Sequence, residues 1–298
     1  MRPFISVIIP NYNHSLYLDE RINSVLNQSY DNYEVIILDD KSSDNSVEVI
    51  NKYKEHPKVT QIIINEVNSG SAFIQWHRGF SAAKGDLIWI AESDDTCEPN
   101  LLEKLVREFE LHSDLSLSFC RSLKINEKGI VIGKRIKASP STYMNGITFI
   151  KKHLCMINFV ANASSALFKK EIAKSLDKDY MNYKGCGDWL FWTELAEKGN
   201  VSIVNQQLNY FRQHGDNTTS SNSRKGINVI EIRKIYDYLR GKNYLNIYQR
   251  FKINLKYTYA IYYEINFLSQ ADKDHCAEVW RVNPFMLFCA KIKKLLNR

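Results

Sequence analysis

The sequence predicts an α/β fold in which helices flank a mostly parallel sheet and a helical extension follows at the C-terminal end. The first 95 residues alternate short apolar, β-branched runs with longer amphipathic stretches, the pattern of parallel strands joined by crossover helices. From Gly226 onward, aromatic and basic residues become frequent on stretches with helical spacing. The 298 residues suffice for one large or two ordinary domains. We expect an α/β domain over residues 1–215 and a helical, basic extension over residues 216–298.

Four apolar runs are expected to form the first strands: Ile5–Ile9, Val35–Asp39, Thr60–Ile64 and Leu87–Ala91. Helical spacing of the apolar residues over 16–26 predicts a helix between the first two strands. A second helix should follow Asn45, with Glu48 three residues later as its capping partner. Before the fourth strand, Phe73 and Trp76 have the spacing of an amphipathic helix that packs into the core. The expected order is therefore β-α-β-α-β-α-β.

The middle of the chain is expected to complete the same domain. A helix is predicted over Leu101–His112, followed by short strands at Leu117–Leu123, Ser165–Phe168 and Val201–Val204. A further helix is expected over Asp188–Glu197. No repeat or low-complexity tract interrupts the sequence.

Charge and cysteine content restrict the class of protein. The net charge is +7, and residues 215–298 hold 15 basic and 7 acidic side chains. The six cysteines form no C-x-x-C pair and have no histidine at ligand spacing, which indicates reduced thiols and no zinc site. The N-terminal apolar run is broken by Pro10 and is too short for a secretory signal, and no run approaches the roughly 20 apolar residues of a membrane span. We therefore expect a cytoplasmic protein that can be peripheral at the inner membrane face.

Two pairs of acids, Asp39-Asp40 and Asp94-Asp95, directly follow predicted strands. Open parallel sheets bind ligands beyond the carboxyl ends of their strands, so both pairs should lie at one crevice. Four carboxylates gathered there would repel one another unless a cation neutralised them. Oxygen ligands without a Cys or His cluster suit Mg²⁺ or Mn²⁺, which usually also bind substrate phosphates. The alternative is that each pair only shapes a loop or caps a helix, roles that Asp favours.

The sequence contains neither a Walker A motif nor G-x-G-x-x-G, which argues against kinase, ATPase and dehydrogenase functions. Instead, a series of motifs follows in order: Ser6-Val7-Ile8-Ile9-Pro10-Asn11-Tyr12-Asn13, Leu38-Asp39-Asp40-Lys41-Ser42-Ser43-Asp44, Asn68-Ser69-Gly70, Ala83-Lys84-Gly85-Asp86, Glu92-Ser93-Asp94-Asp95, Gly187-Asp188-Trp189 and Tyr210-Phe211-Arg212-Gln213-His214. This series resembles the family 2 glycosyltransferases. The resemblance covers about 215 residues and implies the GT-A fold, a Rossmann-like, mostly parallel sheet flanked by helices.

The resemblance implies roles for the residues near the N-terminal strands. Asp40 would hydrogen-bond the nucleotide base, and Pro10 and Tyr12 would frame it. Asp95 would be the metal ligand, whereas Asp94 would contact the ribose or sugar of the donor or assist the metal. Glu92 stands where many relatives have Asp, and we expect it to support the ligands without binding the metal itself.

The resemblance also implies roles for residues further along the chain. Asp188 would be the general base, although the common Glu-Asp pair of the family is Gly187-Asp188 here. The alternative for Asp188 is a helix cap. His214 would ligate the metal or hydrogen-bond a phosphate, with a freely titrating loop histidine as its alternative. Arg212 would contact phosphate.

Other conspicuous side chains carry less specific indications. Residues 70–79 lack the arginine of the Ala-Arg-Asn segment that faces the donor in many relatives. Gln75, Trp76 or Arg78 can substitute for that arginine, but a helix that packs into the core explains Trp76 better. The remaining histidines, including His14, are expected to be surface or packing residues.

The expected function is that of a metal-dependent, inverting glycosyltransferase. The resemblance implies a UDP-sugar as donor, a saccharide or lipid-linked saccharide as acceptor, and a role in surface polysaccharide synthesis. Two alternatives remain: a nucleotidyltransferase, which would usually carry a glycine-rich phosphate loop after the first strand, and a non-catalytic nucleotide-sugar-binding scaffold. The basic, amphipathic C-terminal tail either lies on an anionic membrane surface or packs on the catalytic domain. No nucleic-acid recognition motif is present.

Overall fold

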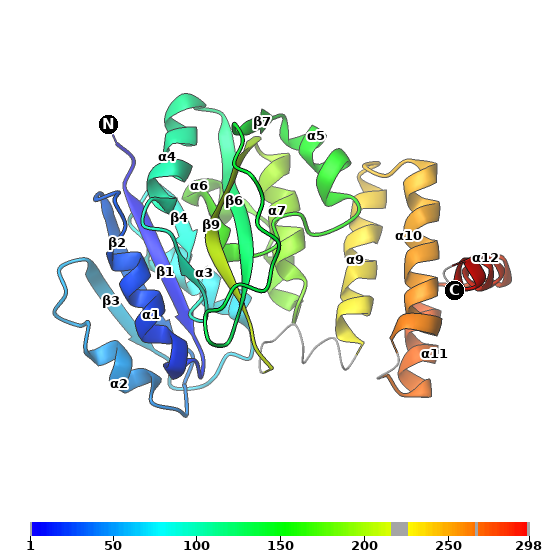
Figure 1. The fold of residues 1–298 in the computed structure, drawn as a ribbon, viewed down its shortest axis with the longest axis horizontal. Helices are drawn as coiled ribbons and strands as arrows, with labels where there is room; N and C mark the ends of the chain where they lie inside the picture. Colours follow the sequence, from blue (N-terminus) through cyan, green and yellow to red (C-terminus); the bar gives the residue numbers. More distant parts are fainter. Residues whose placement is uncertain (1, 216–225, 266–267, 297–298) are drawn as a thin grey trace.

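The computed structural model describes residues 2–215, 226–265 and 268–296. One sheet runs through the molecule, with helices on both of its faces and a layer of C-terminal helices at one end (Figure 1). In the described chain, nine strands form this sheet in the order β3-β2-β1-β4-β8-β6-β9-β5, with β7 paired to β9. The α/β fold class expected from the sequence is confirmed.

The first four long strands are parallel, as expected from the alternating pattern. They are β1 (Ile5–Asn11), β2 (Tyr33–Asp39), β3 (Val59–Ile64) and β4 (Leu87–Ile90). The helices between them are α1 (Ser15–Leu26), α2 (Ser46–Asn51) and α3 (Ala72–Ala82). Register pairs Asn11 with Asp39, so β1 and β2 end side by side at the edge where their polar loops begin.

The expected cap of α2 is wrong. Asn45 precedes the helix, but its side chain makes no capping hydrogen bond. Asp44 takes this place, because its carboxylate accepts the backbone N–H of Ser46 at 3.0 Å and that of Ser15 at 2.9 Å. One acid thereby ties the start of α2 to the start of α1.

The second half of the sheet mixes strand directions. Its strands are β5 (Thr96–Cys97), β6 (Leu115–Asn126), β7 (Thr142–Met144), β8 (Ala166–Lys169) and β9 (Asn200–Gln213). Strand β9 is far longer than the expected Val201–Val204, because it stays paired in parallel with β6 across register shifts near Arg121. The polar run Asn205-Gln206-Gln207 lies within β9, and it hides the strand from a reading of apolar residues alone. The long β9 delivers the segment around His214 to the same edge as β1.

The remaining elements of the first 215 residues are helical. They are α4 (Leu101–Leu111), α5 (Gly146–Phe149), the π-turn η1 (Ile150–Leu154), the 3₁₀ turn η2 (Ala163–Ser165), α6 (Lys170–Ser175), the 3₁₀ turn η3 (Lys178–Asn182) and α7 (Gly187–Glu197). The helices expected over 101–112 and 188–197 are confirmed to within about a residue.

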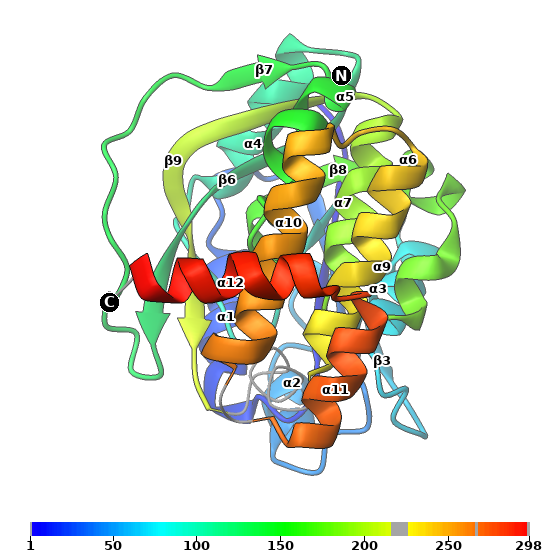
Figure 2. The ribbon, with the colours of Figure 1, turned by 90° about the vertical axis from the view of Figure 1, so that its right-hand side faces the viewer.

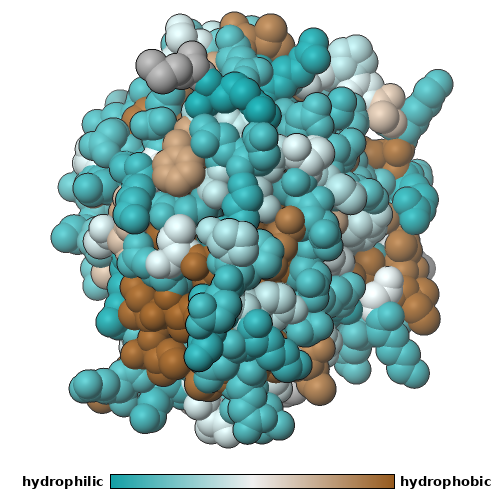
Figure 3. Space-filling model, turned by 90° about the vertical axis from the view of Figure 1, so that its left-hand side faces the viewer, coloured by the Kyte–Doolittle hydropathy of each residue, from teal (hydrophilic) through white to brown (hydrophobic). Residues whose placement is uncertain are grey.

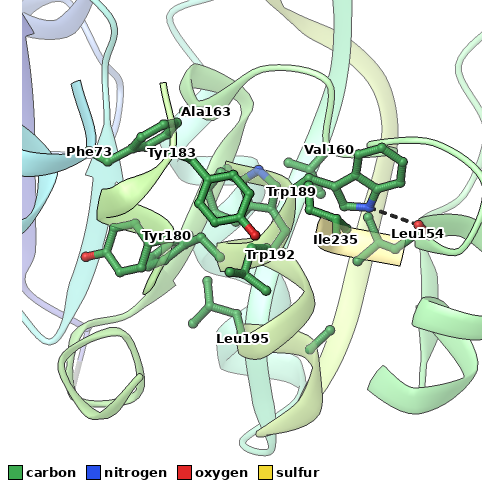
Figure 4. Packing of buried hydrophobic residues seen from close by; sticks show 14 of the residues in the cluster. Phe73, Leu154, Val160, Ala163, Tyr180, Tyr183, Trp189, Trp192, Leu195 and Ile235 are labelled. Carbon is green, nitrogen blue, oxygen red and sulfur yellow. Dashed lines mark hydrogen bonds between the residues drawn. The ribbon is translucent and has the colours of Figure 1, made fainter. Parts of the chain in front are cut away.

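Two hydrophobic clusters pack on the two faces of the sheet. In β2, Ile36 and Leu38 belong to one cluster, and Val35 and Ile37 belong to the other, the two-residue alternation of a strand buried on both sides. Helices α3 and α7 cover the first face, whereas α1 and α4 cover the second. Figure 4 shows aromatic residues from α3, η3 and α7 in the first cluster. Hydrophilic side chains cover most of the outer face on the β3 side of the sheet (Figure 3).

The C-terminal helices are α9 (Ile227–Gly241), α10 (Ile247–Tyr259), the π-turn η4 (Ala260–Glu264), α11 (Gln270–Val279) and α12 (Pro284–Leu296). Residues of α9, α10 and α11 join the same buried cluster as α7, and Tyr236 packs edge-on against Trp189 at 5.6 Å. Helix α12 lies across α10 at the outside of this layer (Figure 2). The expected boundary after residue 215 falls next to residues 216–225, which lie outside the described residues. Within the described ranges, no helix has the length and apolar character needed to cross a membrane.

Candidate active site

A cavity of about 360 Å³ opens at the carboxyl ends of the parallel strands. Three residues expected to bind the donor line it: Pro10 and Tyr12 from the end of β1, and Asp40 from the end of β2. Glu92, which follows β4, and Lys184, which precedes α7, also line it, together with residues of the segment that leads into α3 and with Asn11, His14 and Ser93. Segments far apart in the sequence therefore meet at the edge where open parallel sheets bind ligands.

Asp40 is fixed within this cavity by four hydrogen bonds. Its carboxylate accepts the side-chain N–H of Asn65 at 2.6 Å, the backbone N–H and hydroxyl of Ser69 at 2.9 and 2.7 Å, and the amide of Gln75 at 2.8 Å. The Oε1 atom of Gln75 is buried and has no partner among the described residues. Asp40 therefore presents a rigid acceptor at the wall, and Gln75, which stands in the region where the family arginine is missing, offers a second one.

Asp39 has a different environment from its neighbour. It is fully buried and accepts hydrogen bonds from the Asn11 amide at 2.8 Å, and from the Ser42 backbone and hydroxyl at 2.9 and 2.6 Å. These contacts shape the loop after β2. The loop-forming alternative therefore accounts for Asp39, whereas Asp40 lies at the cavity.

Asp94 lies in a cluster of possible metal ligands. His214 Nε2 and Asp94 Oδ2 are 3.0 Å apart, and their side chains are only 5% and 13% exposed. One ligand atom from each of His14, Asp94 and His214 lies within 4.8 Å of the others. Burial alone would raise the pKa of Asp94, but the hydrogen bond from His214 and the charges of His14 and His214 lower it below its usual range. The cluster therefore holds an ionised carboxylate between two imidazoles.

Asp95 is occupied within the protein. It is 0% exposed, and its Oδ2 accepts hydrogen bonds from the Asn162 amide at 2.8 Å and the Ser164 hydroxyl at 2.7 Å. Its Oδ1 accepts the backbone N–H of Arg212 at 3.0 Å. Burial and the neighbouring Asp94 raise the pKa of Asp95 to about 7. The geometry thus favours Asp94 over Asp95 as the acid that meets a ligand.

Arg212 is also directed inward. Its side chain is 2% exposed, and it donates to the backbone carbonyls of Asp94 at 2.7 Å, Asn126 at 3.3 Å and Glu127 at 3.0 Å. It also pairs with Glu20, whose carboxylate lies 2.5 Å from Nη2. Arg212 does not line the cavity described above. These contacts fix the backbone that carries Asp94, and the expected contact of Arg212 with phosphate stays a prediction.

His14 was expected to be a surface or packing residue, but it lies in the candidate metal cluster. It directly precedes α1, and its Nδ1 is 2.8 Å from the hydroxyl of Ser93. The available signal was its place in the sequence, because His14 follows the polar segment at the end of the first strand. That is the same edge of the sheet at which the acidic pairs emerge.

Glu92 contacts the core through Trp76. The indole Nε1 donates to Glu92 at 2.8 Å, while the rest of Trp76 packs against Phe73 and α7. Burial raises the pKa of Glu92 to about 8, and the negative charge of Asp94 is the second cause of this increase. Trp76 is therefore a buried core residue, as expected, and it also orients an acid at the cavity wall.

Asp188 stands in the first turn of α7. Its Oδ2 accepts the side-chain amide of Asn158 at 2.6 Å, and its Oδ1 accepts the backbone N–H of Trp189 at 2.9 Å. Burial raises the pKa of Asp188 to about 7, while these two hydrogen bonds act in the opposite direction. A carboxyl group that titrates near neutral pH has the proton affinity expected of a general base.

A single segment connects Asp188 to the acids after β4. Asn158 donates to Asp188, and Asn162, four residues later, donates to Asp95. Four residues of extended chain span at most about 14 Å. Asp188 does not line the 360 Å³ cavity itself, but Lys184, four residues earlier, does, and Gly187 packs against Phe73, which directly follows the cavity residue Ala72.

The loop before Asp188 is held by α9. The carboxylate of Glu231 accepts three consecutive backbone N–H groups, from Lys184 at 2.5 Å, Gly185 at 2.9 Å and Cys186 at 2.9 Å. Sequence reasoning missed Glu231, because nothing in its local sequence distinguishes it from other helical acids. The C-terminal helices therefore contribute to the geometry of the site.

Close packing explains why glycine precedes Asp188. A Cβ atom on Gly187 would lie 2.4 Å from the backbone oxygen of Tyr180 and 2.8 Å from the ring of Phe73. Neither contact leaves room for a side chain, so the acid that many relatives have here cannot be accommodated. Figure 4 shows Phe73 and Tyr180 close together in this part of the core.

Comparisons with known proteins agree with this architecture. Residues 6–176 match the sequence model of glycosyl transferase family 2. An uncharacterised glycosyltransferase of Nostoc sp. is 28% identical over 95% of this chain and 88% of its own length, and the teichuronic acid biosynthesis glycosyltransferase TuaG of Bacillus subtilis, a putative assignment, is 27% identical over 75% and 84%. Chondroitin synthase of Pasteurella multocida is 29% identical over 81% of this chain, which spans 24% of that enzyme.

Solved structures share the fold. TarS of S. aureus, in complex with UDP-GlcNAc, superposes with a TM-score of 0.60 at 18% identity over 93% of this chain and 71% of that one. The mannosyltransferase PcManGT of Pyrobaculum calidifontis, in complex with GDP-Man and Mn²⁺, gives a TM-score of 0.57 at 15% identity over 100% and 88%. The family match covers more than half of the sequence and includes β1 from its second residue onward, both acidic pairs and the segment that donates a hydrogen bond to Asp95. The chain therefore belongs to glycosyl transferase family 2 and is a glycosyltransferase.

Proposed function

We propose that this enzyme is an inverting, metal-dependent transferase that moves a hexose from a UDP-sugar to a hydroxyl of a saccharide or lipid-linked saccharide. The observation that carries the proposal is the pairing of two acids through one segment, Asp188 with Asn158 and Asp95 with Asn162. We infer that this segment links the base, whose pKa is raised to about 7, to the acidic pair that contributes Asp94 to the cluster with His14 and His214.

In the proposed reaction, a carboxylate oxygen of Asp188 takes the proton of the acceptor hydroxyl. The hydroxyl oxygen forms a bond to the anomeric carbon while the bond from that carbon to the diphosphate oxygen breaks. The nucleoside diphosphate leaves with the electron pair, and the configuration at the anomeric carbon inverts. One carboxylate suffices, because a base of this kind contributes roughly 10²- to 10⁴-fold and the diphosphate departs without protonation.

The donor set of the cluster fits a divalent ion. Two imidazoles and one carboxylate suit a transition-metal ion such as Mn²⁺ better than Mg²⁺, which prefers oxygen ligands. We assign the ion to His14, Asp94 and His214. Asp95 would support this site by accepting the backbone N–H of Arg212, two residues before His214. When bound, the ion would neutralise charge on the diphosphate leaving group.

We assign the nucleotide to the 360 Å³ cavity. Asp40 offers its fixed carboxylate to a base N–H, and Tyr12, which is 48% exposed, provides an aromatic face next to Pro10. Aromatic side chains stack on bases because both have π faces. UDP-GlcNAc and GDP-Man in the complexes of TarS and PcManGT support a nucleotide-sugar donor.

Relatives support a role in polysaccharide synthesis. Two relatives are named as polysaccharide synthases, chondroitin synthase and hyaluronan synthase, and TuaG is putatively assigned to teichuronic acid biosynthesis. We therefore propose a surface glycan as product. Helix α12 is suited to hold the enzyme at an anionic membrane where a lipid-linked acceptor would reside, because it carries exposed Phe285, Phe288 and Leu295 and three lysines in its second half.

A donor and metal screen tests the proposal. Purified enzyme is titrated calorimetrically with UDP, GDP and CDP, each with Mn²⁺, with Mg²⁺ and with chelator, and release of nucleotide from UDP-sugars is then followed with saccharide acceptors. We expect UDP to bind most tightly and only with the divalent ion. Equal binding with chelator would contradict the metal assignment, and sugar-nucleotide formation from a sugar phosphate would favour a nucleotidyltransferase.

A further inference from the structure

A second cavity, of about 270 Å³, lies within the C-terminal helical layer. Its walls come from α9, α10 and the turn between α11 and α12, and none of its lining residues lines the nucleotide cavity. Four arginines take part in this lining: Arg233, Arg240, Arg250 and Arg281. We call it the arginine cavity.

The charge of the arginine cavity is not balanced by the protein. Asp237 is the one acid among the described residues that line it, and it pairs with Nε of Arg233 and Nη2 of Arg240, both at 2.9 Å. Arg250 donates its Nε to the backbone oxygen of Leu245 at 3.1 Å. The guanidinium of Arg281 makes no hydrogen bond within the described chain. Three positive charges are therefore in excess at one hollow.

Arg233 is buried in the wall of this cavity, where its one acidic partner, Asp237, is shared with Arg240. The side chain of Arg233 is only 9% exposed, and it is held over the buried ring of Trp280 at 5.5 Å with Nη1 bonded to the Trp280 carbonyl at 3.0 Å. Bringing further cations to the same hollow raises the electrostatic cost of burying it. An anionic ligand would remove this repulsion.

Arg281 occupies a backbone position that favours glycine. Its φ is +50°, and the N–H groups of Arg281 and Val282 close the end of α11 on the carbonyls of Glu278 and Ala277 at 2.9 and 3.0 Å. Glycine or asparagine is preferred at this left-handed position after a helix. An arginine here is less favourable for folding, yet its side chain contributes to the wall of the cavity.

We propose that the arginine cavity binds a phosphate or diphosphate group. Guanidinium groups match the oxygens of phosphate in planar, two-point hydrogen bonds, which makes arginine the preferred side chain for such anions. The volume is below the roughly 300 Å³ at which pockets for whole organic ligands begin. The group is therefore either free in solution or the headgroup of a lipid, and α12 with its exposed apolar side chains borders the cavity through Met286.

The test uses the full chain in chelator, so that binding of diphosphate at the candidate metal site is minimal. Inorganic diphosphate is titrated calorimetrically into the wild type, Arg250→Gln and Arg281→Gly. Arg281→Gly removes the guanidinium but places glycine where the backbone favours it, so the Tm should stay equal or rise. The matched control is Lys291→Gln, which removes one charge from exposed α12 outside the cavity lining.

We expect diphosphate binding to weaken about tenfold or more in both arginine variants, as for the loss of a charge-assisted hydrogen bond, and to stay within about twofold in Lys291→Gln. A second arm measures co-sedimentation with phosphatidylcholine vesicles that contain phosphatidic acid or, at equal charge, phosphatidylglycerol. Retention on phosphatidic acid that is lost in Arg281→Gly assigns the site to a lipid headgroup, and diphosphate binding without such retention assigns it to a soluble anion. Arginine variants that match the wild type in both arms, or no binding of either probe, would overturn the proposal.

Discussion

The carboxylate of Glu231 accepts the backbone N–H of Cys186 at 2.9 Å, two residues before Asp188. Glu231 belongs to α9, and the loop that it holds leads into α7. Two further N–H groups of the same loop point to the same carboxylate. The position of the proposed base therefore depends on a helix that the sequence would assign to a separate extension.

Replacing Glu231 is expected to slow the transfer step more than it weakens donor binding. In Glu231→Ala, three backbone donors lose their acceptor, and an unsatisfied buried donor costs about 1–3 kcal/mol. We expect kcat to fall about tenfold or more while the Kd for UDP stays within about twofold, with partial recovery in Glu231→Gln. Glu278→Gln on exposed α11 is the control. An equal loss of kcat in both positions would show that the loop does not depend on Glu231.

The acid limb of the pH profile is expected to follow Asp188. Burial raises its pKa to about 7, and a base must be deprotonated, so kcat/KM should fall as the pH drops through about 7. Asn158 donates to Asp188 and lowers its pKa, so Asn158→Ala should move the limb to higher pH. Asp188→Asn should abolish transfer and keep UDP binding. Transfer by Asp188→Asn with an unchanged profile would remove the assignment.

The sequence indicated which acids follow the ends of strands or begin a helix, but it did not indicate which side chains each acid contacts. Asp40, Asp94 and Asp188 carried local signals, namely a preceding apolar run or a glycine-flanked helix start. The different environments of Asp94 and Asp95 carried none, because they depend on Asn162, Ser164 and His214, which reach the two acids only in the folded chain.

Other features were hidden for related reasons. Strand β9 contains a polar run and could not be read from apolar alternation. Glu231 looks like any helical acid until α9 is packed against the loop before α7. Local pattern therefore predicts elements and their ends, whereas contacts between distant segments decide which acids are held within the protein and which lie at the cavity or the cluster.

Metal-dependent nucleotide binding should distinguish Asp94 from Asp95. Asp94→Asn and His214→Ala remove ligands of the proposed cluster, so the gain in UDP affinity from Mn²⁺ should fall about tenfold or more, in line with the loss of a metal ligand or its partner. Asp95→Asn should mainly lower the Tm, because three groups donate hydrogen bonds to that buried carboxylate. His77→Ala on α3, outside the cluster, is the control. Loss of the Mn²⁺ effect in a well-folded Asp95→Asn, with Asp94→Asn unaffected, would return the ligand role to Asp95.

Adding one methyl group at Gly187 is expected to damage both stability and catalysis. The new Cβ would lie 2.4 Å from the Tyr180 carbonyl oxygen, which is backbone and cannot rotate away, so the start of α7 must shift. Overpacking of this kind typically costs about 1–3 kcal/mol, and a displacement of about 1 Å at a reacting group can cost 10²-fold in rate. We expect Gly187→Ala to lower the Tm and to reduce kcat more than UDP affinity. Gly241→Ala at the end of α9 is the matched control, because a Cβ there meets nothing within 4 Å. If Gly187→Ala kept the wild-type kcat, the proposed base would not depend on the exact start of α7, and the case for Asp188 would weaken with it.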